Sequence, residues 1–109
     1  MPIPKAEIAV AFDQMKVIRT SLYHSEEAVL ACKTALKRRE ASLLLSGAII
    51  GKNAETRDAQ LKEGCKDEIA ALERAESDRR ATQLSYELSC MTVDRLKWLI
   101  RAEEAGKEI

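Results

Sequence analysis

The sequence predicts an all-α protein, built as an antiparallel hairpin of long, coiled-coil-like helices. Both prolines stand at positions 2 and 4, so residues 5–109 contain no proline, and alanine, the strongest helix former, occurs sixteen times. Apolar residues also recur about every 3.5 residues along two segments, which is the seam pattern of a coiled coil. A length of 109 residues predicts a single domain, residues 1–109.

The first helix is expected to span about residues 4–46. From Ile8 to Leu43, steps of three and four residues meet an apolar residue at nine of eleven positions. The helix should end at Gly47, because glycine readily adopts the left-handed conformation that closes a helix. A turn over residues 47–53 follows.

The second helical region is expected to span about residues 54–105. Asn53 is a suitable N-cap, since its side-chain oxygen can accept from the free amides of the first turn. Stepping from Leu61 to Ile100 meets an apolar residue at eight of twelve positions. Gly64 predicts a break or kink, and Gly106 is expected to close the last helix.

Two helices joined by a short connection lie antiparallel. With the turn centred on residue 50, Ile18 faces the level of Tyr86, and Arg79 is expected to pair with Glu26 or Glu27. Trp98 is expected to pack near Ile8 and Phe12, although a partner-binding role is the alternative.

A lone hairpin of this length has little interior, so we expect a homo-oligomer in which two hairpins form a four-helix bundle. Apolar residues beside the second seam supply the candidate interface, which comprises Leu84, Leu88 and Leu99.

The sequence contains no constellation typical of catalysis or of metal binding. The three cysteines are far apart, which predicts small buried apolar residues rather than disulfides or a zinc site. His24 is the single histidine, and no Glu-x-x-His pair occurs. We therefore expect no enzyme, no catalytic residue, no metal and no cofactor. The absence of a long apolar run and of a signal peptide predicts a cytoplasmic protein without a membrane partner.

Charge is distributed unevenly along the chain. Residues 33–66, here called the basic tip, hold eight basic and four acidic residues, a net charge of +4 in a neutral chain. The tip is either a solvated surface or a site for an anionic partner such as nucleic acid, bound weakly and without sequence preference. The contacts proposed for such a partner are Lys37, Arg38, Lys52 and Arg57.

The run from Gly51 to Leu61, with its Gly-Lys-Asn-x3-Arg turn, resembles small uncharacterised helical-hairpin proteins of bacterial viruses and prophages. The resemblance implies an accessory role inside a bacterial host and supplies no catalytic residue. The leading hypothesis is a non-enzymatic accessory protein that binds a host or viral protein as an adaptor or inhibitor. The alternatives are a nucleic-acid-associated factor using the basic tip, and a structural oligomer without a separate ligand.

Overall fold

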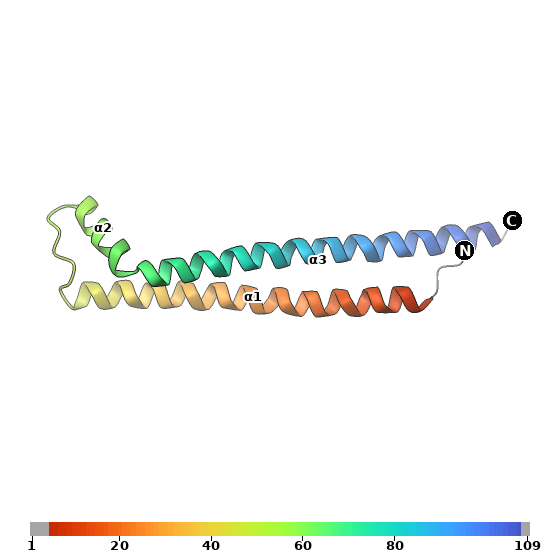
Figure 1. The fold of residues 1–109 in the computed structure, drawn as a ribbon, viewed down its shortest axis with the longest axis horizontal. Helices are drawn as coiled ribbons and strands as arrows, with labels where there is room; N and C mark the ends of the chain where they lie inside the picture. The colour runs from red at the N-terminus through yellow and green to blue at the C-terminus, as the bar shows by residue number, and fades with distance from the viewer. Residues whose placement is uncertain (1–4, 108–109) are drawn as a thin grey trace. The chain divides into compact units, whose positions relative to one another are not determined.

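A computed structural model describes residues 5–107, which form three helices and no strand. The helices are α1 (Lys5–Leu45), α2 (Ala54–Gly64) and α3 (Lys66–Lys107), as Figure 1 shows. Long helices α1 and α3 run antiparallel beside each other, so the predicted all-α hairpin is confirmed. The described residues fall into two compact units, a terminal unit (5–24 with 80–107) and a corner unit (25–79). A single domain stays a prediction.

The predicted seams supply the core of each unit. Ala11, Leu22 and Val93 are buried in the terminal unit, and Val29, Cys65 and Ala75 are buried in the corner unit. All six residues belong to the two apolar series read from the sequence, because residues three and four apart lie on one face of a helix. Most are small, and this makes the core thin.

Side-chain contacts in the terminal unit fix which levels of α1 and α3 meet. The Met15 sulfur lies 3.8 Å from the Cys90 sulfur, and the Arg19 guanidinium lies 5.8 Å from the centre of the Tyr86 ring. A turn centred on residue 50 would instead have placed Met15 opposite a residue about one turn before Cys90. The expected level of Ile18 with Tyr86 is therefore confirmed to within one residue, whereas the centre of the connection lies a little beyond residue 50, because α2 and the bend after it belong to the connection.

The connection between α1 and α2 is held by Gly47 and Asn53, as expected, and by Gln60, which the sequence had not indicated. Gly47 has a φ of +75°, which confirms the left-handed end of α1. The Asn53 side chain caps α2 by accepting from the Thr56 amide at 2.8 Å. One side-chain oxygen of Gln60 accepts from the amides of Ile50 and Gly51, at 2.9 and 3.1 Å, and so ties the loop to α2.

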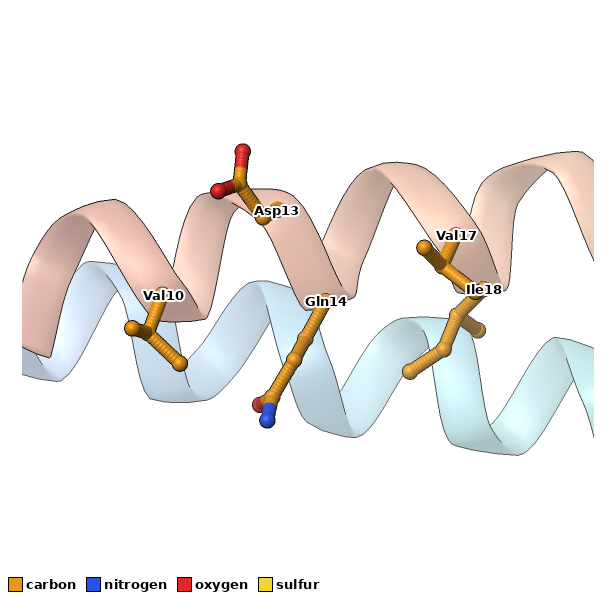
Figure 2. A pocket seen from close by; sticks show the side chains of 5 residues that line it. All are labelled: Val10, Asp13, Gln14, Val17 and Ile18. Carbon is orange, nitrogen blue, oxygen red and sulfur yellow. The ribbon is translucent and has the colours of Figure 1, made fainter.

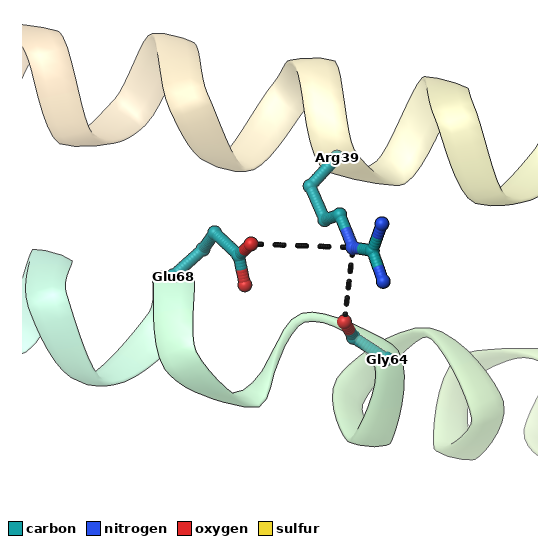
Figure 3. Close-up of polar contacts among 3 residues, drawn as sticks. All are labelled: Arg39, Gly64 and Glu68. Atoms are coloured by element: carbon teal, nitrogen blue, oxygen red, sulfur yellow. Dashed lines mark hydrogen bonds and ion pairs between the residues drawn. The ribbon is translucent and has the colours of Figure 1, made fainter.

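The predicted break at Gly64 is confirmed, since α2 ends there and α3 begins at Lys66. Leu43 packs so closely that a Cβ on Gly64 would lie 2.5 Å from its Cδ1 atom. The Nε of Arg39 donates to the Gly64 carbonyl at 3.3 Å and lies 4.0 Å from a Glu68 carboxylate oxygen (Figure 3). A side chain at position 64 would therefore require the Leu43 side chain to move.

Two further expectations are wrong. Gly106 does not close α3, which continues through it to Lys107; Gly47 is the single described glycine with a positive φ. The glycine remains helical because a residue near a helix end can follow the preceding turn at small cost. Arg79 forms no ion pair with Glu26 or Glu27, whose side chains are exposed to solvent.

Candidate interaction surface

The described residues contain no assembled chemical centre. Within residues 5–107, no three His, Cys, Asp or Glu side chains gather in a way that could hold a metal ion. His24 lies on the surface, with its ring edge-on to Tyr23 at 5.7 Å between ring centres. The features that remain are surfaces, and these are candidates for binding.

The cysteines are all free, but the expectation of burial holds fully for one of them. Cys65 is 1% exposed, whereas Cys32 and Cys90 are half-buried. Burial raises the pKa of the Cys65 thiol, and the nearby carboxylates of Glu40 and Glu68 raise it further. Because the thiolate is the reactive form of cysteine, Cys65 is a packing residue at the corner.

A row of exposed apolar side chains runs along α3 in the terminal unit. We call it the α3 stripe; its members, between 42% and 69% exposed, are Leu84, Leu88, Met91, Trp98 and Leu99. The spacings of four, three and seven residues from Leu84 to Trp98 place these residues on one helix face, on the opposite side of α3 from the buried Val93, and Leu99 follows at the edge of that face. Contiguous apolar surface of this kind marks interaction sites on soluble proteins.

A groove adjoins the α3 stripe. One hollow, of about 290 Å³, lies between the two helices and includes Gln14 and Ile18 of α1 and Leu88 of α3. A second hollow, of about 370 Å³, shares Gln14 and Ile18 and extends over Val10 and Val17 (Figure 2). The two hollows share Gln14 and Ile18, and together we call them the groove beside the stripe.

Charged residues flank the α3 stripe, and few of them are paired with other side chains of the chain. The Arg101 guanidinium lies 5.9 Å from the centre of the Trp98 ring, and Glu87 accepts from the Gln83 side chain at 3.2 Å. Asp94 and Arg95 are exposed in the middle of the stripe. Apolar side chains that charged residues flank and, at Asp94 and Arg95, interrupt form a mixed surface, and protein-binding surfaces are commonly mixed in this way.

The structure brings the predicted interface residues Leu84, Leu88 and Leu99 together on this face. Trp98 corrects an expectation, since it is exposed rather than packed near Ile8 and Phe12, and Phe12 instead contacts Lys97, whose Nζ lies 5.1 Å from the ring centre. The helix turns Trp98 to the face of α3 that points away from α1. Trp98 lies seven residues after Met91 and therefore on the same helix face, which is a signal that the sequence already contained.

The four candidate contacts for an anionic partner are all exposed on the corner unit. They do not form a net positive unit, because residues 25–79 contain ten basic and eleven acidic residues. Acidic residues of early α3 lie against the tip, as the approach of Glu68 to Arg39 shows. Arg57 is partly engaged, since its Nε donates to the Asn53 carbonyl at 3.4 Å.

Comparison of the chain with protein-family models, curated proteins and solved structures finds no match. Among the residues that the structure describes, no helix combines the length and apolar character needed to cross a membrane. The α3 stripe and its groove are therefore the features of the chain that bear on its function.

Proposed function

We propose that this protein acts without catalysis, by binding another protein through the α3 stripe and the adjoining groove. In this role it serves as an accessory adaptor or inhibitor of the kind implied by its resemblance to viral and prophage proteins. The observation that carries the proposal is the exposure of five large apolar side chains on one face of α3.

The energetic argument follows from the area that these side chains expose. Complete burial of a large apolar side chain is worth about 1.5–3 kcal/mol, and each member of the stripe is roughly half exposed. Covering all five is therefore worth on the order of 5 kcal/mol before the costs of association. A surface with this potential gain is better explained by a protein partner than by solvation alone.

Binding of nucleic acid by the basic tip is the second candidate. The exposure of Lys37, Arg38, Lys52 and Arg57 favours it. The near-neutral charge of the corner unit weighs against it, because long-range attraction to phosphate depends on net positive charge.

The protein-partner proposal is tested by affinity capture from the bacterial host. The baits are the wild type, Leu88→Glu, and a control with Lys37→Ala and Arg38→Ala, each first shown to be helical by circular dichroism. We expect the wild type and the control to recover the same protein and Leu88→Glu to lose it, because a charge buried at an interface without a partner is costly. Equal recovery by all three baits would contradict the proposal.

A further inference from the structure

We propose that the α3 stripe binds a second copy of this chain, docked antiparallel with the two-fold axis at the level of Val93. This inference rests on the proposed function, because it concerns the same surface, and a second copy bound there competes with any other protein for the stripe. Three observations carry it: the heptad spacing of the stripe, the placement of charge along it, and the surface that a single copy leaves exposed.

The stripe forms a second coiled-coil seam on α3. Leu84, Met91 and Trp98 are seven residues apart, and Leu88, Arg95 and Ala102 follow each of them by four. This alternation of four and three residues is the core pattern of paired helices. The seam facing α1 is separate from it, since Val93 on that side is buried.

Antiparallel docking about Val93 gives apolar neighbours to Leu84 and Leu88, and it sets Met91 against Arg95 of the second copy at the centre of the seam. Leu88, five residues before the axis, faces Trp98 of the second copy, five residues after it. Leu84 in the same way faces the small Ala102 of the second copy, which leaves room for the leucine. Each contact occurs twice, as an isologous interface requires.

Charge favours the same arrangement. At the edge of the seam, Glu87 lies opposite Arg101 of the second copy, and Arg95 lies beside Asp94 of the second copy. The Asp94 side chains of the two copies meet near the axis, where both Arg95 side chains lie close enough to compensate them. A parallel pair would instead place Arg95 directly against Arg95 within the seam, which is unfavourable.

The exposed area of one copy suits a dimer. The chain exposes 8375 Å², whereas a compact monomer of 12.2 kDa exposes about 6,100 Å². The difference, about 2,300 Å², exceeds the ~800 Å² that each partner contributes to a standard interface. A single copy therefore exposes more surface beyond that of a compact monomer than an interface of standard size needs.

The mass of the particle and its response to charge reversal test the inference. Sedimentation equilibrium should give twice the 12.2 kDa mass at micromolar concentration. Glu87→Arg and Arg101→Glu should each raise the dimer Kd about fivefold or more, because two edge pairs of about 0.5 kcal/mol are lost. An equimolar mixture of the two variants should restore the wild-type Kd, since every edge pair is then of opposite sign. Arg38→Glu, a reversal outside the stripe, should leave the Kd unchanged.

Cross-linking tests the antiparallel register. In a background with Cys32→Ser and Cys90→Ala, Ser85→Cys and Leu99→Cys are made separately and treated with a short bis-maleimide. Ser85 faces Leu99 of the second copy in the proposed pair, so the mixture should cross-link. Ser85→Cys alone should not, because its two copies are sixteen residues, about 24 Å, apart along the helices.

The outcomes separate this inference from the proposed function. A monomer at about 100 μM, or efficient cross-linking of Ser85→Cys to itself, would overturn the antiparallel dimer. If the chain is a monomer and Leu88→Glu still abolishes capture of a different protein, the proposed function stands with another occupant. If the chain is a monomer and Leu88→Glu captures the same proteins as the wild type, both proposals fail.

Discussion

Adding a methyl group at Gly64 should strain the corner where α1 meets the end of α2. In Gly64→Ala the new Cβ would lie 2.5 Å from Cδ1 of Leu43, and 3.6 and 3.7 Å from Cδ2 and Cγ. Leu43 must therefore rotate away, and overpacking of this kind costs about 1–3 kcal/mol. Replacing a helical glycine by alanine also raises the free energy of unfolding by about 0.4–1 kcal/mol, because the unfolded chain loses conformational freedom. We expect a net loss of about 1 kcal/mol, or roughly 4 °C in Tm for a chain of this length.

A double-mutant cycle isolates the contact between the two residues. Urea unfolding is followed by circular dichroism for the wild type, Gly64→Ala, Leu43→Ala and the double variant. Once Leu43 is shortened the clash is gone, so Gly64→Ala should become neutral or stabilising, with a coupling energy of about 1 kcal/mol or more.

Gly106→Ala is the matched control, because a Cβ there meets nothing within 4 Å. It should not destabilise the protein, whether residue 43 is leucine or alanine. The same cost for Gly64→Ala with and without the Leu43 side chain would refute the reasoning.

Three further predictions concern the cap, the buried thiol and the basic tip. Asn53→Ala should lower the free energy of unfolding by about 1 kcal/mol in urea, while Asn53→Asp retains it, since only the second keeps an acceptor for the Thr56 amide. The raised pKa of Cys65 predicts stability that is complete below pH 9.0 and falls as pH rises through the pKa of the folded state, a loss that Cys65→Ala should lack in pH-dependent unfolding. If four tip residues contact duplex phosphates, affinity should fall about 100-fold between ~50 and ~200 mM salt, and equal binding by a fourfold alanine variant would exclude this. That variant replaces Lys37, Arg38, Lys52 and Arg57.

Local signals predicted the helices and their ends well. Gly47 and Asn53 act through their own backbone or side chain, so their roles can be read from neighbouring residues alone. Gly64 was recognised as a break, but its reason, the approach of Leu43, is a tertiary contact that no local pattern contains. The centre of the connection was missed for the same reason, although the level of Ile18 with Tyr86 was predicted to within one residue.

The candidate surface was predicted in part. Leu84, Leu88 and Leu99 were identified as apolar residues beside the main seam, and this reasoning depends on periodicity alone. Trp98 was assigned to packing because aromatic residues are usually buried, a tendency that the helix phase overrides. The charge of the basic tip was counted along the sequence, whereas the fold brings Glu68 against Arg39 from outside that stretch.

The thin core has a consequence for how such a protein can diverge. Its buried positions hold mainly alanine, valine and cysteine, with one leucine at Leu22. Small apolar residues exchange for one another at modest cost, and exposed helical positions accept most residues other than proline and glycine. Selection for the hairpin therefore constrains helix lengths and the spacing of small residues far more than residue identity. Descendants could keep this architecture after their sequences had ceased to resemble one another.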